Sequence, residues 1–192
     1  MTIKLLAFSG SSRRDSLNGR LLAAGVAAAR AQGAEVTLLD LRELALPIYD
    51  GDLEAESGLP AGAFAFRRAL AAHHALLVAS PEYNGLFSPL LKNAVDWASR
   101  PVAGEAQPFS GRVAGLLAAS PGALGGMRAL PVVRQLFNNL GVLVTPGMLS
   151  LPHADQAFAA DGQLLDATRR KALDRVVGDL LATAGALRPP TA

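Results

Sequence analysis

The sequence predicts an α/β protein with a doubly wound sheet of five parallel strands, in the order 2-1-3-4-5, and helices on both faces. Three observations lead to this fold. Short apolar segments alternate with helical segments along the chain, which is the pattern of successive β-α-β units. Several apolar runs are continuous, as expected for strands buried on both faces. Short links between the segments favour right-handed crossovers, which place helices on either side of a parallel sheet.

Five segments are expected to form the strands. The first is an apolar run that ends at Ser9 and Gly10, and the third and fourth are almost entirely apolar. In chain order the expected strands are Ile3 to Phe8, Glu35 to Leu39, Ala75 to Ser80, Arg112 to Ser120 and Val142 to Pro146.

Each expected strand is followed by a segment with the composition of a helix. The first is rich in Leu and Ala and ends before Gly33, a common residue just past a helix terminus, and the second has proline in its first turn. The expected helices are Leu17 to Gln32, Pro60 to Ala72, Pro89 to Arg100, about Gly126 to Leu140 and about Leu164 to Ala184.

Two longer stretches lack periodicity. Leu44 to Leu59 and Leu151 to Gln163 contain turn-forming residues and are expected to be surface loops. The length of 192 residues fits one domain, expected over residues 1–187, and the proline-containing end, residues 188–192, is expected to fray.

Charge and composition exclude several classes of function. The formal net charge is +2, and the longest basic run is three residues, Arg169 to Lys171, so the electrostatic footprint of a nucleic-acid-binding protein is missing. The absence of cysteine excludes disulfides, thiolate metal sites and a cysteine nucleophile. No apolar run approaches the roughly 18 residues of a membrane span, and the start of the chain lacks a signal-peptide pattern. We therefore expect no nucleic-acid or membrane partner and a cytoplasmic location.

The run GSSRRDSLN, from Gly10 to Asn18, is the strongest indication of function. It joins the first strand to the first helix, so free backbone N–H groups and the positive end of the helix dipole point into it. Its side chains add donors suited to a phosphate monoester. These donors are the hydroxyls of Ser11, Ser12 and Ser16, the amide of Asn18 and the guanidinium groups of Arg13 and Arg14.

The composition of this loop also fits purely structural roles. Serine, aspartate and asparagine before a helix are ordinary caps, and loop arginines are usually solvated. The glycine pattern of dinucleotide-binding loops and the Gly-Lys-Ser/Thr of Walker loops are both absent. A hydroxyl-rich loop of this kind suits a mononucleotide phosphate.

In a sheet of this order, ligands bind beyond the carboxyl ends of the first and third strands. The loop after the third strand is SPEYNGLFSP, Ser80 to Pro89, and the loop after the fourth is SPGALGG, Ser120 to Gly126. The three glycines of the second loop are expected to let backbone amides approach a flat ligand. Together with the Gly10 to Asn18 loop, these segments are predicted to form one site.

At this point the residues resemble a known family, the NADPH-dependent FMN reductases of the flavodoxin-like fold, which include quinone and chromate reductases. The first signature of the family is similar to GSxRxxSxN, and the second is similar to PEYN followed by PxxLKNAxDW. The matching positions are Gly10, Ser11, Arg13, Ser16 and Asn18, then Pro81, Glu82, Tyr83 and Asn84, then Pro89, Leu91 to Ala94, Asp96 and Trp97.

The resemblance implies an FMN-dependent NAD(P)H oxidoreductase. Hydride from NADPH or NADH would reach FMN N5, and the electrons would pass in a ping-pong sequence to a small acceptor such as a quinone, a flavin or a metal oxyanion. No catalytic acid or base is required, and a homodimer or homotetramer is implied. The implied cofactor-binding residues are Ser11, Arg13, Ser16, Leu17 and Asn18 around the phosphate, Pro81, Glu82, Tyr83 and Asn84 along the ribityl chain and ring, and Ser120 and Gly122 at the ring.

Two other functions remain possible. An electron-carrier flavodoxin would bind FMN without oxidising NAD(P)H, although such carriers are usually strongly acidic. A flavin-free module could keep the fold. The physiological acceptor is open, and so is the preference between NADPH and NADH. Arg14 or Arg128 could meet a 2′-phosphate or be surface charges, and Glu82 and Tyr83 could be loop residues without a role in the site.

Several further residues are interpreted as structural. His73 and His74 are adjacent and cannot share a metal on a helix, so a helix-end role is expected. His153 with Asp155 does not make a metal site, and Asp40 is interpreted as a cap or turn residue. An apolar arc on the Pro89 to Arg100 helix fits either a deeply buried helix or an interface with a second copy; it consists of Leu90, Leu91, Ala94, Val95, Trp97 and Ala98.

Overall fold

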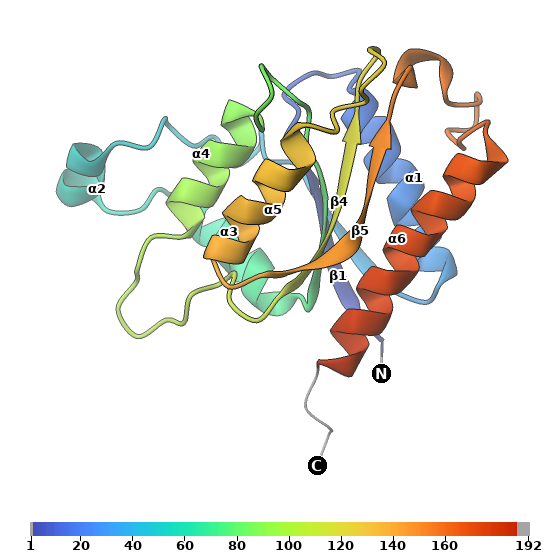
Figure 1. Ribbon diagram of the computed structural model, residues 1–192. Coiled ribbons are helices and arrows are strands. Elements are labelled where there is room, and N and C mark those ends of the chain that lie inside the picture. Colours follow the sequence, from blue (N-terminus) through green and yellow to red (C-terminus); the bar gives the residue numbers. More distant parts are fainter. Residues whose placement is uncertain (1, 188–192) are drawn as a thin grey trace.

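The computed structural model describes residues 2–187 and confirms the predicted sheet. Five parallel strands pair in the order β2-β1-β3-β4-β5 (Figure 1). The predicted fraying of residues 188–192 lies outside the described residues. The strands are β1 (Lys4–Ser9), β2 (Glu35–Leu39), β3 (Ala75–Ala79), β4 (Val113–Ala119) and β5 (Leu143–Leu151).

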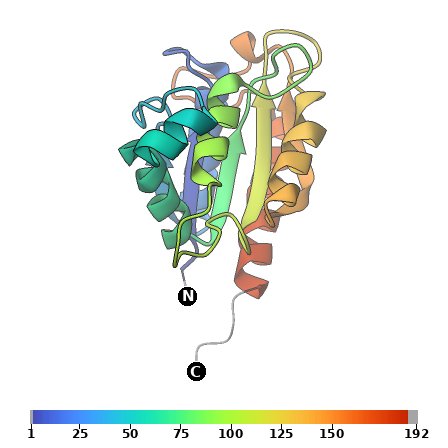
Figure 2. The ribbon, with the colours of Figure 1, turned by 90° about the vertical axis from the view of Figure 1, so that its left-hand side faces the viewer.

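Helices cover both faces of the sheet, as the predicted crossovers require. Figures 1 and 2 show α1 and α6 against one face and α3, α4 and α5 against the other. The α-helices are α1 (Leu17–Ala31), α2 (Gly51–Ser57), α3 (Ala61–Ala72), α4 (Pro89–Ala98), α5 (Ala129–Asn139) and α6 (Ala167–Ala186), and a short 3-10 helix, η1, covers Ala154–Gln156.

The hydrophobic core has two layers because successive strand residues point to opposite faces. In β1, Leu5 and Ala7 pack under α1 and α6. Their neighbours Leu6 and Phe8 pack under α3, α4 and α5. All residues of β3 and β4 are buried, so the continuous apolar runs predicted central strands correctly.

The fifth strand continues past its predicted end at Pro146 and reaches Leu151. The pairing with β4 shifts register between Ala114 and Leu116, opposite Thr145, Pro146 and Gly147. A proline that donates no hydrogen bond is tolerated because β5 is an edge strand. The expected loop from Leu151 to Gln163 also contains η1.

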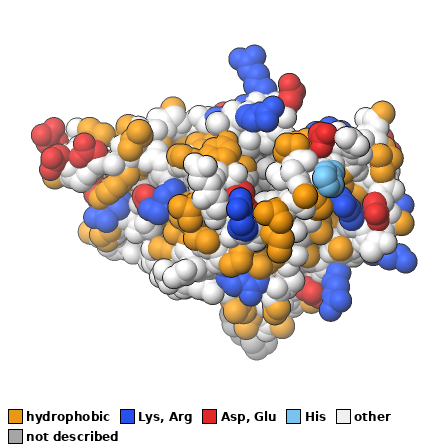
Figure 3. Space-filling model, turned by 45° about the horizontal axis from the view of Figure 1, so that its top comes forward, with side chains coloured by type: hydrophobic (Ala, Val, Ile, Leu, Met, Phe, Trp, Pro, Cys, Tyr) orange, Lys and Arg blue, Asp and Glu red, His pale blue; other side chains and the backbone are white. Residues whose placement is uncertain are grey.

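The stretch Leu44 to Leu59, predicted to be a loop, contains the helix α2 and forms an arm that projects from the body (Figure 1). The prediction missed α2 because it has no buried residue and therefore no apolar periodicity. Tyr49 fixes the arm to α4: its N–H donates to Asn93 Oδ1 at 2.7 Å, and its hydroxyl donates to Glu54 at 2.8 Å. Figure 3 shows acidic side chains at the tip of the arm.

The structural roles predicted for His73 and Asp40 are confirmed. His73 is the C-cap of α3, and its ring nitrogens lie 2.6 Å from Ala69 O and 2.8 Å from Thr37 Oγ1. Asp40 closes a turn by accepting from Arg42 N at 2.9 Å. Residues 2–187 contain no helix that is long and apolar enough to span a membrane.

Candidate functional site

The three predicted loops meet at the carboxyl ends of β1, β3 and β4, where they enclose a cleft of about 120 Å³. We call it the three-loop cleft. Every predicted site residue lines it except Asn84 and Gly122, and it adds Ala119 and Pro121. Its lining residues are Ser11, Arg13, Ser16, Leu17, Asn18, Pro81, Glu82, Tyr83, Ala119, Ser120 and Pro121.

The Gly10–Asn18 loop supplies donors to this cleft. Ser16 caps α1, because its Oγ accepts a hydrogen bond from Gly19 N at 3.0 Å. The backbone N–H groups of Leu17 and Asn18 make none of the hydrogen bonds found among residues 2–187. The hydroxyls of Ser11 and Ser16 are nearly buried, and each retains a proton to donate. This donor set at a helix N-terminus fits a phosphate group.

Asn18 holds the loop to the sheet. Its Nδ2 donates to Ala119 O at 2.9 Å, and its Oδ1 accepts from Ala119 N at 2.9 Å. The side chain therefore ties the start of α1 to the end of β4, and one N–H of its amide is left for a ligand. Leu17 is partly buried and packs on the α1–α6 side of the core.

Gly10 is required where the loop leaves β1. A Cβ atom there would lie 2.7 Å from Ser88 Oγ and 2.9 Å from Leu91 Cβ. Ser88 caps α4 by accepting from Leu91 N at 3.2 Å and donates to Gly10 O at 2.5 Å. The Gly10–Asn18 loop and the start of α4 are therefore locked together.

Glu82 is a structural carboxylate of the site. Its side chain is 7% exposed and ion-paired with Arg128. One oxygen accepts from Arg128 N at 3.0 Å and Ala129 N at 3.3 Å, and the other accepts from Arg128 Nε at 2.6 Å. A carboxylate at a helix N-terminus satisfies free N–H groups and complements the helix dipole. Glu82 thus holds the start of α5 against the loop after β3, and its carboxylate neutralises the charge of Arg128.

Tyr83 and Asn84 form a tight turn beside the cleft. Tyr83 and Leu86 exchange backbone hydrogen bonds at 2.9 and 3.1 Å. Asn84 and Gly85 between them have φ values of 54° and 84°, which is the pattern of a type I′ turn. Asn84 is exposed at the tip of this turn, and Tyr83 and Leu86 present partly exposed apolar side chains.

The glycines of the loop after β4 divide into two kinds. A Cβ added at Gly122 would lie 3.7 Å from Ser120 Oγ, an ordinary contact, and the residue is exposed, so its backbone can be approached. Gly125 and Gly126 have positive φ and are packed so tightly that an added Cβ would lie 2.4 Å from Pro152 N or 2.8 Å from Ala118 Cβ. These two glycines are needed for the backbone conformation and the close packing of the loop. The helix α5 therefore begins at Ala129 and not near Gly126 as predicted.

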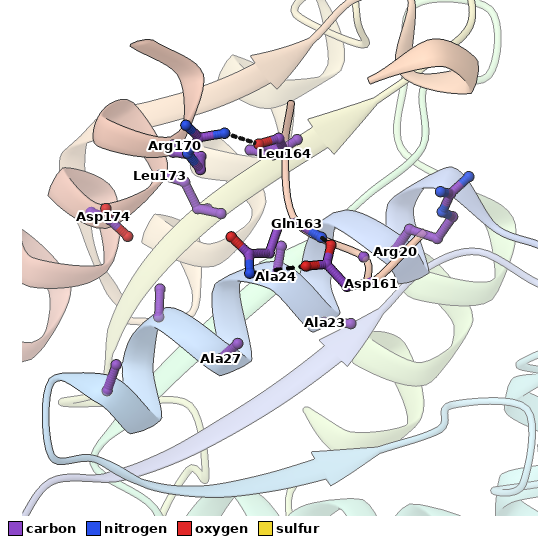
Figure 4. Close-up of a pocket in the computed structure, with 13 residues that line it drawn as sticks. Arg20, Ala23, Ala24, Ala27, Asp161, Gln163, Leu164, Arg170, Leu173 and Asp174 are labelled. Carbon is purple, nitrogen blue, oxygen red and sulfur yellow. Dashed lines mark hydrogen bonds between the residues drawn. The ribbon is translucent and has the colours of Figure 1, made fainter. Parts of the chain in front are cut away.

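A larger cavity, about 430 Å³, lies between α1 and α6 on one face of the sheet (Figure 4). We call it the α1–α6 groove. Its floor is a row of alanines from α1, and two of its polar side chains bond to neighbours: Gln163 Nε2 donates to Asp161 at 3.1 Å, and Arg170 donates to Leu164 O. Arg20, which also lines the groove, lies over the Phe158 ring at 4.5 Å from its centroid. Most of the remaining lining is alanine and leucine, so its chemistry does not indicate a phosphate or cofactor site.

The described residues show no metal site: no group of three or more His, Asp or Glu side chains could hold an ion within 2–187. His153 has a left-handed backbone conformation and stands at the start of η1, and its N–H donates to Gly122 O at 3.3 Å. The segment after β5 therefore supports the loop after β4.

Comparisons with known proteins give reductases as relatives over most of the chain. The chain is 38% identical over 175 residues to an NAD(P)H-dependent FMN reductase of Pseudomonas aeruginosa, with 90% of each protein covered. It is 32% identical over 185 residues to an NADPH:quinone oxidoreductase of Arabidopsis thaliana, covering 94% of this chain and 91% of that protein.

Solved structures show the same fold. A flavoenzyme NAD(P)H:acceptor oxidoreductase from Paracoccus denitrificans superposes with a TM-score of 0.83 at 26% identity, covering 96% of this chain and 98% of that chain. A flavodoxin from the domain Archaea gives a TM-score of 0.61 at 11% identity over 95% of this chain and 99% of that chain, which is evidence for the fold alone.

The sequence model described as NADPH-dependent FMN reductase matches residues 3–156. That range contains all three loops of the cleft. The chain therefore belongs to the NADPH-dependent FMN reductase family, a family of oxidoreductases, and has a flavodoxin-like fold.

Proposed function

We propose that this protein binds FMN in the three-loop cleft, oxidises NAD(P)H and reduces a small acceptor of the quinone type in a ping-pong sequence. When bound, FMN supplies the redox chemistry, since its N5 accepts hydride. The observation that carries the proposal is the start of α1, where the Leu17 and Asn18 N–H groups and the Ser11 and Ser16 hydroxyls are available to an anion in a cleft.

The size of the cleft indicates how much of FMN it holds. About 120 Å³ is small against the roughly 300 Å³ or more of a pocket that encloses a whole drug-sized ligand. The phosphate and ribityl chain fit the enclosed part. The ring would lie at the open rim, between the Tyr83–Leu86 turn and the exposed backbone of Gly122. A ring held in this way keeps one face accessible to NAD(P)H and to the acceptor.

The backbone at the rim has an electrostatic role. Gly122 is reachable from solvent, and N–H groups of loops after parallel strands stabilise negative charge that develops on a ligand. Glu82 accepts hydrogen bonds from α5, so its side chain holds the two ring-side loops in register. The protein needs no acid or base at the ring, because its contribution is to position the cofactor and leave one face open.

An anaerobic titration tests the proposal. FMN is added to the purified protein, excess is removed, and the visible spectrum is followed as NADPH is added without oxygen. The expected result is a bound flavin spectrum that bleaches and is restored by benzoquinone. Bound flavin that NADPH and NADH both leave oxidised would indicate an electron carrier, and failure to bind FMN would contradict the assignment of the cleft.

The ping-pong order has its own measurement. Initial rates at several fixed benzoquinone concentrations should give parallel double-reciprocal lines against NADPH. Lines that intersect would show that both substrates bind before the first product leaves. The acceptor class is compared by kcat/KM for benzoquinone, free FMN and chromate, with the quinone expected to be highest.

The predicted homodimer or homotetramer is part of the proposal. The apolar arc on α4 supports it less than expected, because Leu91, Val95 and Trp97 are buried within this chain. Beside α4 lies an apolar cavity that includes Leu90, and Ile48 on its wall is 86% exposed. This surface fits a second copy. Light scattering at micromolar concentration should give at least twice the 19.8 kDa mass of the chain. A cytoplasmic location is likewise proposed.

A further inference from the structure

A second cavity, about 400 Å³, opens on the opposite side of the Gly10–Asn18 loop, between the start of α1 and the end of β2. We call it the β2 pocket. It shares Ser11, Arg13 and Ser16 with the three-loop cleft. The same loop therefore faces two cavities, of which the three-loop cleft is the one assigned to FMN under the proposed function.

The β2 pocket carries an excess of positive charge. Three arginines, Arg13, Arg14 and Arg42, line it together with two acids, Asp40 and Glu43. Neither Arg13 nor Arg14 takes part in an ion pair within residues 2–187. Both are exposed in the loop, so their guanidinium groups are available to an anionic ligand.

Arg42 is oriented by Asp40 and still has donors to offer. Its Nε lies 3.0 Å from both carboxylate oxygens of Asp40, and its Nη2 bonds to one of them. No hydrogen bond among the described residues uses Arg42 Nη1. Hydrogen bonds from Arg42 also hold the pKa of Asp40 below its ordinary value, so the pair stays charged at neutral pH. A fixed guanidinium with a free edge is a good phosphate donor.

The pocket also has an apolar wall. Leu22 of α1 and Leu38 and Leu39 of β2 contribute to it, and Leu38 is 62% exposed although it belongs to a strand. An apolar surface beside several guanidinium groups matches a ligand with a flat, weakly polar ring and a phosphate. A purine nucleotide has both parts.

The position of Asp40 and Arg42 suggests which nucleotide is preferred. In dinucleotide-binding folds a free carboxylate at the end of the second strand accepts hydrogen bonds from the ribose 2′-hydroxyl, whereas an arginine accommodates a 2′-phosphate. Here Asp40 follows β2, but its oxygens are occupied by Arg42. The pair therefore presents guanidinium N–H groups in place of a free carboxylate, which favours a 2′-phosphate over a 2′-hydroxyl.

We propose that the β2 pocket binds the adenosine 2′-phosphate end of NADPH, with Arg14 and Arg42 as the residues that favour NADPH over NADH. This inference rests on the proposed function, because it assigns a site to the hydride donor of that reaction. Arg128 has no such role in this proposal, because its guanidinium group is ion-paired and hydrogen-bonded with Glu82.

Kinetics of the FMN-loaded protein test the proposal. Arg42→Ala and Arg14→Ala should each raise KM for NADPH about tenfold relative to KM for NADH, because losing one charge-assisted hydrogen bond costs roughly that factor. Arg175→Ala, at an exposed arginine of α6 outside the pocket, is the matched control and should leave the ratio unchanged. Equal effects on both nucleotides, or no effect on either, would overturn the proposal.

A binding measurement separates this proposal from the proposed function. Calorimetry with adenosine 2′,5′-bisphosphate and with 5′-AMP needs no turnover. The bisphosphate should bind the FMN-loaded protein at least about tenfold more tightly than 5′-AMP, by the same charge-assisted contact, and Arg42→Ala should remove the difference.

The outcomes are distinguishable. A bisphosphate that binds equally to wild type and to Arg42→Ala, or that displaces FMN, would show that the β2 pocket is not a separate nucleotide site. NADPH oxidation without any binding of the bisphosphate would contradict the pocket while leaving the proposed function intact. Arg14 makes no side-chain hydrogen bond or ion pair among the described residues, so Arg14→Ala tests the proposal even if Arg42→Ala folds poorly.

Discussion

The three-loop cleft is much smaller than the α1–α6 groove, yet the cleft has the features of a phosphate-binding site and the groove does not. The groove has a volume of about 430 Å³ and the cleft about 120 Å³. In the groove, Gln163 bonds to Asp161, and Arg170 bonds to backbone carbonyls. In the cleft, the N–H groups of the first residues of α1 have no partner among residues 2–187. Free backbone N–H groups at a helix N-terminus, rather than volume, locate the site.

The two regions also differ in the range of the contacts that form them. The groove has a floor of alanines from a single helix, α1, and packs against α6. The cleft is assembled by long-range contacts: Asn18 to Ala119, Ser88 to Gly10, and Glu82 to the start of α5. Substitutions that break these long-range contacts should therefore affect stability and FMN affinity together, whereas substitutions in the groove should affect neither.

The largest effect is expected at Gly10. Gly10→Ala places a Cβ within 2.9 Å of both Ser88 and Leu91, and overpacking of this kind costs about 1–3 kcal/mol. The Gly10–Asn18 loop must move away from α4, so FMN affinity should fall at least about tenfold with the lost stability. Chemical denaturation followed by Trp97 fluorescence, and an FMN titration, measure the two effects.

Gly185→Ala is the matched control for this change. Its Cβ would have no neighbour closer than 3.9 Å, and alanine is favoured over glycine in a helix by up to about 1 kcal/mol. This variant should be as stable as wild type or slightly more stable, with the same FMN affinity. Unchanged FMN binding in Gly10→Ala would contradict the locking of the loop by Ser88.

The next largest effect is expected at Glu82. Glu82→Ala removes a buried carboxylate that caps α5 and pairs with Arg128, and the loss should be about 2 kcal/mol of stability. Because the two ring-side loops lose their connection, the absorption maximum and affinity of bound FMN should change as well. Glu82→Gln keeps the shape and one acceptor, so it should recover part of both properties.

Asp166→Ala provides the comparison for Glu82→Ala. Asp166 also caps a helix with its carboxylate, accepting from Thr168 N at 2.7 Å and Arg169 N at 3.1 Å, but it lies outside the cleft. Its removal should lower the thermal midpoint without changing the spectrum or affinity of FMN. If Glu82→Ala behaves in the same way, Glu82 only caps its helix and does not position the ring-side loops.

The contribution of Asp166 should depend on pH. Hydrogen bonds from Arg169 N and Thr168 N hold the pKa of Asp166 below its ordinary value of 3.8. The folded state therefore favours the charged form, so its stabilisation is fully present above the unfolded pKa and is lost as the pH falls through the lower folded pKa. Thermal midpoints of wild type and Asp166→Asn should differ at pH 7 and converge as the solution is acidified below pH 3.8. A constant difference would contradict this account.

A smaller effect is expected at Arg13. This side chain lines the cleft but is exposed, so Arg13→Ala should leave the thermal midpoint unchanged and weaken FMN about tenfold through one lost charge-assisted contact. Riboflavin, which lacks the phosphate, should bind wild type and Arg13→Ala equally. Equal weakening of both flavins would place Arg13 at the ring instead of the phosphate.

The smallest effect is expected in the α1–α6 groove. Ala27 is exposed on its floor, and Ala27→Lys fills part of the volume with a side chain that reaches solvent. Stability should change by less than about 0.5 kcal/mol, and FMN affinity and NADPH oxidation should match wild type. A clear loss of activity would show that the groove is coupled to the cleft.

Sequence alone determined the features that depend on neighbours along the chain. The burial of β3 and β4 followed from their continuous apolar runs, and the Gly10–Asn18 loop followed from a strand, a hydroxyl-rich turn and a helix in succession. The strand order was predicted as one of the common orders of doubly wound sheets. These patterns have a local or topological cause, so they are visible without coordinates.

The tertiary structure decided which side chains face which partners. Glu82 could have been solvated, but it meets the start of α5, 46 residues further along the chain. Asn18 is hydrogen-bonded to Ala119, which is 101 residues away in the sequence. Asp40 and Arg42 line one wall of the β2 pocket, and residues of α1 line another. No periodicity encodes these contacts, because they arise when crossover connections bring the carboxyl ends of parallel strands to one edge. The sequence thus indicated the place of the site, and packing between distant segments decided which of its polar groups remain free to bind.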